Sequence, residues 1–118
     1  MSYVYCASLL GVIGFQVALI LGAPWGRITQ GGQVDGPLPG LGRVIAAVSI
    51  VILICMALAI LSTAGRWPGW QAWTGWAALG MNTVMMILNW ITPSVPERRL
   101  WGPITTALFG MALAVHLA

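Results

Sequence analysis

Four apolar segments constrain this chain more than any other feature, and they cover residues 4–22, 44–63, 70–91 and 100–118. A helix of about 20 residues crosses the ~30 Å hydrocarbon core of a bilayer. A lone strand cannot, because its backbone N–H and C=O groups would lack partners in lipid. We therefore expect an all-α membrane protein in which four transmembrane helices form one bundle, with residues 1–118 as a single domain.

The composition excludes an ordinary soluble domain. Charged residues make up 6% of the chain and hydrophobic residues 59%, against roughly 25% and 45–50% in soluble domains. So few charged side chains cannot form a polar shell, and the apolar residues must face the lipid bilayer. The net charge of +3 does not indicate a nucleic-acid partner. The arginines lie between the apolar segments, where they orient helices and meet lipid phosphates.

The distribution of arginines predicts the orientation in the membrane. The connectors after the first and third segments share one side and hold Arg27, Arg43, Arg98 and Arg99. The other side holds Arg66 and the N-terminal amine. Cytoplasmic loops carry the excess of positive charge. We therefore expect a multi-pass protein of the cell (inner, cytoplasmic) membrane, with both termini outside and the glycine-rich loop 23–43 in the cytoplasm.

Small residues recur every four positions in two of the segments. The fourth segment has Gly102, Thr106, Gly110, Ala114 and Ala118, and the first has Gly14, Ala18 and Gly22. Membrane helices are generally rich in small residues, but a row at this spacing forms one ridge along a helix and lets backbones approach closely in lipid. We expect the first and fourth helices to touch through these ridges.

Three amides, Gln16, Asn82 and Asn89, lie within the apolar segments. Asn82 and Asn89 are seven residues apart and share one face of a helix. They indicate either hydrogen bonds between helices or a polar site for a substrate or ion, since an amide in hydrocarbon needs a partner. Gln16 lies roughly opposite Gly14 and Ala18 on the helical wheel. Gln16 and the small ridge therefore face different neighbours, and the outward one is a candidate contact with another chain.

A capping pattern predicts where the last helix begins. Ser94 followed by Glu97 is typical of a capping box, with Pro96 tolerated in the first turn. The helix should then begin at Val95, which places Arg98 and Arg99 among the lipid headgroups. The alternative is an anion or lipid-phosphate site that these two arginines form with Arg27 or Arg43.

The remaining chemistry-bearing residues are scattered. Two cysteines and one histidine, His116, give no ligand pattern for a metal, and we expect no metal, cofactor or catalytic residue. The carboxylates Asp35 and Glu97 both lie in connectors. Tryptophans at the predicted segment ends are typical of anchors in the headgroup layer, namely Trp25, Trp67, Trp70, Trp90 and Trp101.

The chain resembles a set of small, uncharacterised four-helix bacterial membrane proteins. The resemblance lies in Gly22-Ala23-Pro24-Trp25-Gly26, Gly31-Gly32, Leu38-Pro39 and Arg43, and in Asn82, Asn89, Ser94, Glu97-Arg98 and Pro103. It implies a fold for most of the chain and no activity.

Three functions remain open from the sequence. We expect a non-enzymatic integral membrane protein that forms a homo-oligomer or an accessory subunit of a larger membrane complex. The alternative is a small dimeric channel or carrier with its polar face at Asn82 and Asn89. The third is a lipid-modifying enzyme that uses Asp35 or Glu97 at the cytoplasmic surface.

Overall fold

The computed structural model describes residues 1–29, 36–37 and 39–117, and this part of the chain is helical without any strand. Asp35 and Ala118 lie outside the described residues. The elements are α1 (Ser2–Ile20), the short 3-10 helix η1 (Gly26–Ile28), α2 (Gly40–Thr63), α3 (Ala72–Ile91) and α4 (Val95–Leu117). The predicted all-helical class is confirmed. Most of the helix ends lie a few residues away from the ends of the predicted segments.

Three helices are long and apolar enough to cross a membrane. They are α1, α2 and α4, with mean hydropathies of 1.9, 3.2 and 1.4. For these three, the predicted length and apolar character of a membrane-spanning helix are confirmed. Among the described helices α3 is long enough but less apolar, because Asn82, Asn89 and several tryptophans fall within it.

Glycines in the left-handed conformation end the first two helices. At the end of α1, the N–H of Gly22 donates to Leu19 O (3.2 Å) and the N–H of Ala23 donates to Ala18 O (3.0 Å). This is a Schellman motif, in which the residue after the cap has a positive φ. Gly22 has a φ of 100°. It was expected to pack helices, but it lies past the end of α1 and terminates it.

A serine begins α4 as predicted. The N–H of Glu97 donates to Ser94 Oγ (3.3 Å), so Ser94 is the N-cap and the helix starts at Val95. The N–H of Ser94 donates in turn to Thr92 Oγ1 (3.3 Å). These bonds satisfy backbone donors that a helix start otherwise leaves open. The local sequence therefore fixes the turn between α3 and α4.

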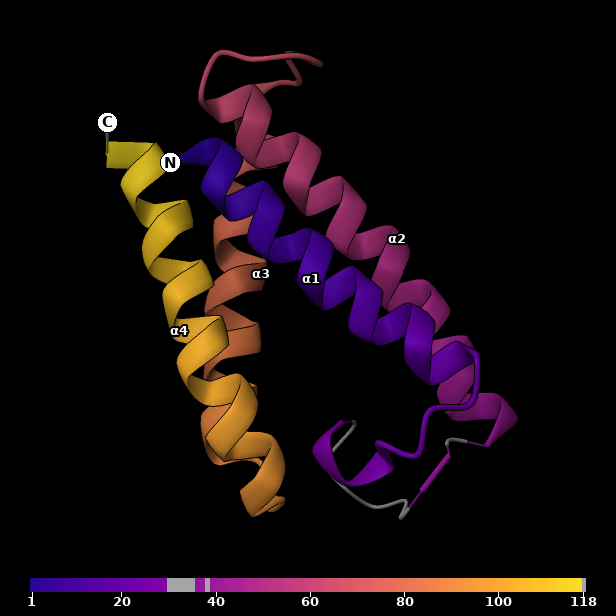
Figure 1. Cartoon of the computed structure of the whole chain (residues 1–118). Helices are drawn as coiled ribbons and strands as arrows, with labels where there is room; N and C mark the ends of the chain where they lie inside the picture. The colour runs from indigo at the N-terminus through magenta and orange to yellow at the C-terminus, as the bar shows by residue number, and fades with distance from the viewer. Residues whose placement is uncertain (30–35, 38, 118) are drawn as a thin grey trace.

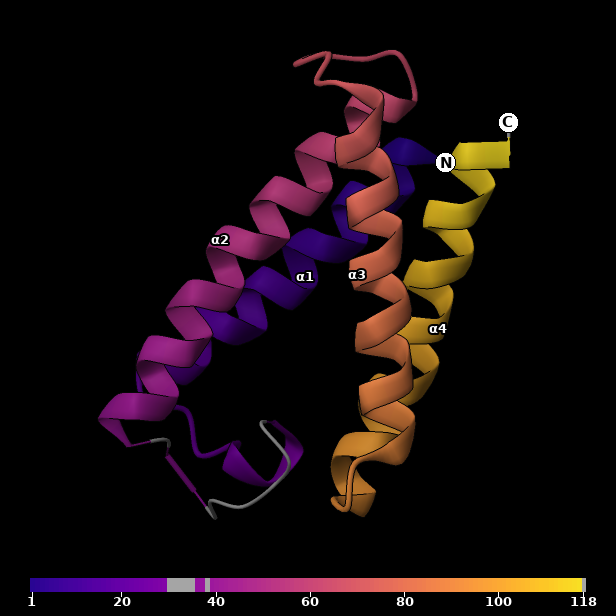
Figure 2. The same ribbon diagram turned by 180° about the vertical axis from the view of Figure 1, so that it is seen from behind.

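The helices form two hairpins, α1/α2 and α3/α4, that meet at one end and diverge toward the other (Figures 1 and 2). Of all pairs of helices, α1 with α2 and α3 with α4 pack most extensively. The joined end holds both termini and the α2–α3 connector, and η1 lies at the open end (Figure 1). The described chain is 42 Å long. One four-helix bundle was expected, and the structure instead has two hairpins that spread apart over part of their length.

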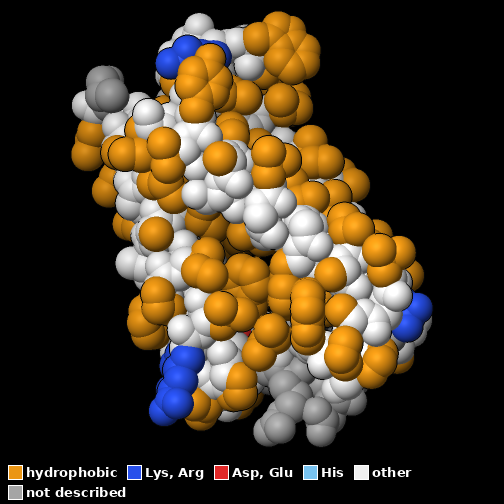
Figure 3. Space-filling view, in the orientation of Figure 1, with side chains coloured by type: hydrophobic (Ala, Val, Ile, Leu, Met, Phe, Trp, Pro, Cys, Tyr) orange, Lys and Arg blue, Asp and Glu red, His pale blue; other side chains and the backbone are white. Residues whose placement is uncertain are grey.

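The shared core lies where the hairpins meet. Its largest fully buried apolar side chains include Tyr5, Leu9, Ile60 and Leu108 from α1, α2 and α4. Outside this core, large hydrophobic side chains such as Val17, Val48 and Leu88 are exposed. Figure 3 shows hydrophobic side chains over most of one face, with the arginines near its ends. A surface of this kind suits lipid rather than water.

The predicted contact between small ridges on α1 and α4 is wrong within this chain. Gly14 and Gly110 are exposed, and a Cβ on either would have no atom within 4 Å. Near Gly102, a Cβ would instead come within 3.1 Å of the Trp90 ring, whose Nε1 donates to Thr106 Oγ1 (2.8 Å). Gly102 and Thr106 therefore accommodate a tryptophan of α3, while Ala18 and Ala114 are half-buried.

The hairpins approach each other closely at Gly75. A Cβ on Gly75 would overlap Thr63 Oγ1 of α2 and lie 3.1 Å from His116 Cε1 of α4. The His116 ring nitrogen Nε2 is 2.9 Å from Gly75 O, and its ring lies 4.3 Å from that of Trp76. Only a residue without a side chain fits where three helices converge, so Gly75 sets the spacing of the joined end.

We predict that Gly75→Ala lowers the free energy of unfolding by about 1–3 kcal/mol, the usual cost of overpacking. Gly80→Ala on the same helix is the matched control, because a Cβ there meets nothing within 4 Å. Thermal unfolding in detergent, followed by circular dichroism, compares them. Adding Thr63→Ala should recover part of the loss, since it removes the overlapping hydroxyl. Equal stability of the Gly75 and Gly80 variants would contradict this account.

Candidate functional site

A cavity of about 580 Å³ lies between the two hairpins, toward the end where they diverge. All four α-helices contribute to it, and the volume is within the range of about 300–1,000 Å³ that is usual for ligand pockets. Its polar lining residues are Gln16, Thr29, Ser49, Asn89, Thr92, Glu97 and Thr105. Its apolar ones are Val12, Phe15, Met85, Leu88, Ile91, Pro93, Trp101 and Leu108.

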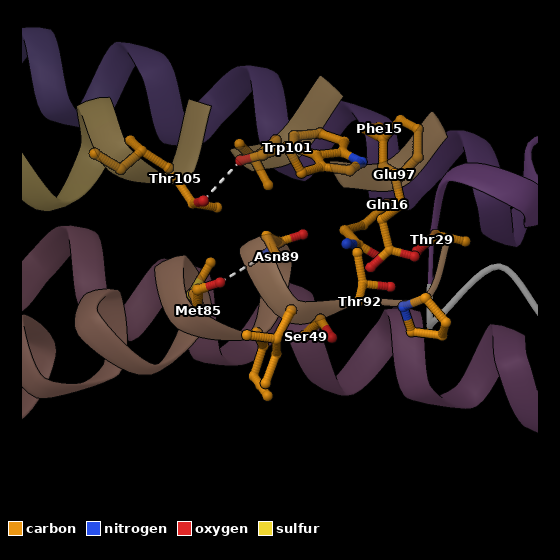
Figure 4. A pocket seen from close by; sticks show the side chains of 15 residues that line it. Phe15, Gln16, Thr29, Ser49, Met85, Asn89, Thr92, Glu97, Trp101 and Thr105 are labelled. Atoms are coloured by element: carbon orange, nitrogen blue, oxygen red, sulfur yellow. Dashed lines mark hydrogen bonds between the residues drawn. The ribbon is translucent and has the colours of Figure 1, made fainter. Parts of the chain in front are cut away.

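The polar side chains gather at one end of the cavity. Figure 4 shows Gln16, Thr29, Thr92 and Glu97 close to one another, with Met85 and Thr105 toward the other end. They come from α1, the segment after η1, the α3–α4 turn and the first turn of α4. Thr29, Thr92 and Glu97 are buried. Four separate pieces of chain therefore converge on one hydrogen-bonding region.

Aromatic rings form the adjoining wall. Phe15 packs edge-to-face against Trp101 at 4.7 Å between ring centroids and stacks on Trp25 at 5.5 Å. The Trp101 Nε1 donates to the carbonyl of Ile28 (2.8 Å), which holds η1 against α4. Trp101 was expected to anchor the protein in the headgroup layer, but its half-buried ring lines the cavity. Its indole N–H has a protein partner, so it does not need the wet interface.

Local hydrogen bonds use the donors of several lining side chains. The Asn89 Nδ2 donates to Met85 O (2.7 Å), the Ser49 Oγ to Ile45 O (2.9 Å) and the Thr105 Oγ1 to Trp101 O (2.6 Å). These bonds run back along each helix and leave the Asn89 Oδ1 and the hydroxyl lone pairs as acceptors. Together with the Glu97 carboxylate, they make the polar lining rich in acceptors.

Asn82 and Asn89 take different places. Asn82 is 1% exposed, and its Nδ2 donates to Tyr5 Oη (2.7 Å) and to Ala78 O (2.9 Å). Its Oδ1 is buried and has no hydrogen-bond partner among the described residues. Asn82 thus joins α3 to α1 in the core, whereas Asn89, two turns away, lines the cavity with Gln16. Gln16 therefore faces inward and the small ridge of α1 faces outward.

Arg43 does not share one site with Arg98 and Arg99. Arg43 is in the first turn of α2, with its Nη2 3.6 Å from where a Cβ of Gly22 would lie. Arg98 and Arg99 are near the start of α4, which lies apart from the start of α2 (Figures 1 and 2). An anion site that combines them with Arg43 is therefore not formed. The side chain of Arg27 lies outside the described part of the structure.

Arg66 has a structural position that the sequence did not indicate. Its Nε donates to Ser2 Oγ (3.0 Å) and its Nη1 to Tyr3 Oη (3.0 Å). The guanidinium carbon also lies 4.1 Å from the centroid of the Tyr3 ring. These contacts hold the α2–α3 connector against the start of α1, at the joined end of the hairpins.

The lining of the cavity suits the binding of a small molecule. The described residues contain no group of three or more His, Cys, Asp and Glu side chains that could hold a metal. His116 lies at the joined end, beyond the cavity that contains Glu97. The cavity offers a hydrogen-bonding end and an apolar body, which together fit an amphipathic molecule.

Several lining residues were missed from the sequence, and one signal could have indicated them. Glu97, Trp101, Thr105 and Leu108 recur at the spacing of a single helix face. This face of α4 points into the cavity. Thr29 carries no such signal, because a contact between η1 and α4 brings it there.

The chain matches no family model, no curated protein and no solved structure in comparisons with known proteins.

We predict that Tyr5→Phe and Asn82→Leu are strongly coupled. Tyr5→Phe deprives a buried amide of a partner and should lower stability by about 0.5–2 kcal/mol. The double variant should be more stable than the sum of the single effects predicts, because it removes both polar groups together. Thermal unfolding in detergent of the four proteins in the cycle measures the coupling. Tyr3→Phe removes a hydroxyl that is bonded to Arg66 and not to Asn82, so its effect should add to that of Asn82→Leu and serves as the control. Additive losses from Tyr5→Phe and Asn82→Leu would contradict a direct link.

Proposed function

We propose that this protein is a non-enzymatic, membrane-embedded carrier that binds a small molecule between its two hairpins. The observation that carries the proposal is the cavity of about 580 Å³, lined by all four α-helices and polar at one end. Asn89, Gln16 and Glu97 supply the hydrogen-bonding groups. Membrane carriers concentrate such groups in protein interiors, because polar side chains facing lipid are costly.

In this proposal all four α-helices span the membrane. α3 lies alongside α4 for most of its length (Figure 2), so its less apolar face can be covered by protein. The excess of arginines places the open end of the hairpins and the cavity's polar end on the cytoplasmic side of the cell membrane, with both termini outside. The resemblance to small bacterial membrane proteins agrees with this location and remains a prediction.

A second candidate function is that of a homo-oligomer or accessory subunit. The supporting observation is that Gly14 and Gly110 are exposed and surrounded by open space. Small residues on a lipid-facing surface allow another helix to approach closely. The two functions are compatible, since the small ridge faces away from the cavity that Gln16 lines.

Ser49→Phe tests the carrier proposal by filling the cavity. Ser49 lines it, and its hydroxyl bonds only to Ile45 O within the described chain, so the change removes no contact between helices. Val48→Phe is the matched control, since Val48 is 53% exposed on the same helix. We expect mass spectrometry of protein purified in mild detergent to find a co-purified small molecule with the wild type and Val48→Phe. Ser49→Phe should be depleted of it.

Folded yield separates loss of binding from loss of structure. Ser49→Phe and Val48→Phe should give similar helical circular dichroism and similar elution on size exclusion. If the same small molecules accompany all three proteins in equal amounts, the cavity does not bind them and the proposal fails.

We also predict that the connector between α1 and α2 is cytoplasmic. A single cysteine at Gly36, in a background of Cys6→Ala and Cys55→Ala, should resist an impermeant maleimide in intact cells and react after lysis. A cysteine at Gly69, in the α2–α3 connector, is the control and should react in intact cells. Labelling of Gly36→Cys from outside would reverse the orientation.

A further inference from the structure

The cavity is elongated along α4, and the proposed carrier function does not by itself explain this shape. Along α4 its lining runs from Glu97 at the helix start to Leu108. At ~1.5 Å per residue this stretch is about 16 Å long. It is about half of the ~30 Å hydrocarbon thickness. The cavity therefore extends from one membrane surface to about the middle of the bilayer.

The lining of the cavity changes from polar to apolar along α4, as a membrane leaflet changes from headgroups to acyl chains. The polar end, with Thr92 and Glu97, belongs to the turn between α3 and α4. Nearby, Trp25 and Trp90 are 42% and 47% exposed, as expected of rings at a headgroup layer. The deep end is formed by Val12, Met85 and Leu108, together with Thr105, whose hydroxyl donates to Trp101 O within its own helix. An occupant would have its head at the level of the lipid headgroups and its tail at the level of the acyl chains.

The size of the cavity limits the occupant to a slender molecule. About 580 Å³ fits within the range for a single small ligand, about 300–1,000 Å³. The rings of Phe15 and Trp101 pack edge-to-face at one wall and narrow the space beside the polar end. One alkyl chain fits this shape better than the two chains of a phospholipid.

The polar end selects the kind of head. Asn89 has its Nδ2 bonded to Met85 O, so its Oδ1 is available as an acceptor. The Gln16 amide both donates and accepts. A hydroxyl head can donate to the Asn89 oxygen and accept from Gln16. A carboxylate or quaternary ammonium head donates no hydrogen bond and would leave the Asn89 oxygen without a donor.

We propose that the cavity between the hairpins binds a single-chain amphiphile with an uncharged, hydroxyl-bearing head, of the monoacylglycerol type. The inference rests on the proposed carrier function and names its substrate class. Such a molecule enters from the leaflet that contains the polar end of the cavity. Its hydroxyls bond to Gln16 and Asn89, and its chain lies against Met85 and Leu108.

Photolabelling in lipid nanodiscs tests the substrate class. The probe is a monoacylglycerol with a diazirine near the end of its chain, and peptide mapping locates the adducts. We expect saturable labelling around Met85 and Leu108 that monoolein competes. Oleic acid and oleyltrimethylammonium, present at the same mole fraction, should compete at least about fivefold less well, the effect of one unpaired buried group. Ser49→Phe should abolish this labelling and Val48→Phe should retain it.

Asn89→Leu directly tests the hydrogen bond between the hydroxyl head and Asn89. It should reduce labelling by the hydroxyl-headed probe and remove most of the preference over oleic acid, because the acceptor is lost. Its thermal stability should stay near that of the wild type, since the Asn89 side chain bonds only within α3 among the described residues. Unchanged preference in this variant would overturn the assigned role of Asn89 in the head site.

The outcomes separate this inference from the function on which it rests. If oleic acid or oleyltrimethylammonium competes as well as monoolein and Ser49→Phe still blocks labelling, the assigned head is wrong and the carrier stands. If no chain-bearing molecule gives labelling sensitive to Ser49→Phe, the amphiphile class is wrong. The carrier function then depends on whether another small molecule co-purifies in a manner sensitive to Ser49→Phe, and it fails if none does.

Discussion

The structure depends on the way in which the two hairpins are joined at one end. The hydrogen bond from the Asn82 amide to the Tyr5 hydroxyl lies in the core and connects α3 to α1. Gly75 allows α3 to approach Thr63 of α2, and His116 of α4 closes over its carbonyl. In an apolar environment, close packing and internal hydrogen bonds hold helices together, because lipid supplies little hydrophobic force between them. The joined end of the hairpins provides both close packing and internal hydrogen bonds within a few turns of each helix.

The cavity follows from joining the hairpins at one end only. With the spacing set at Gly75, the hairpins spread toward η1 (Figures 1 and 2), and the cavity lies between their side chains. The Trp101 indole bonds to the Ile28 carbonyl, so η1 and α4 form part of the wall at the open end. Asn82 and Asn89 illustrate the consequence. They share one face of α3, yet Asn82 lies in the core at the joined end and Asn89 lines the cavity.

Much of the local structure could be predicted from the sequence. The four helices follow from the lengths of the apolar segments, since backbone groups in lipid must bond within their own helix. The start of α4 follows from Ser94, whose hydroxyl accepts the Glu97 N–H. The candidate site was only partly predictable. Gln16 and Asn89 were singled out as polar groups in apolar segments, but Trp101 was assigned to the headgroup layer, and Thr29 reaches the cavity through a contact that is distant in sequence.

The sequence by itself determined the helical class, the membrane-spanning character of three helices and the cap of α4, because each depends on neighbours a few residues away or on summed hydropathy. Only the tertiary structure decided which face of each helix points inward. Gln16 faces the cavity and Gly14 the outside, while Gly102 accommodates Trp90 rather than α1. The physical reason is that surfaces against lipid and against other helices are about equally apolar, so hydropathy does not distinguish them. The choice depends on close packing between helices, and packing exists only once the chain has folded.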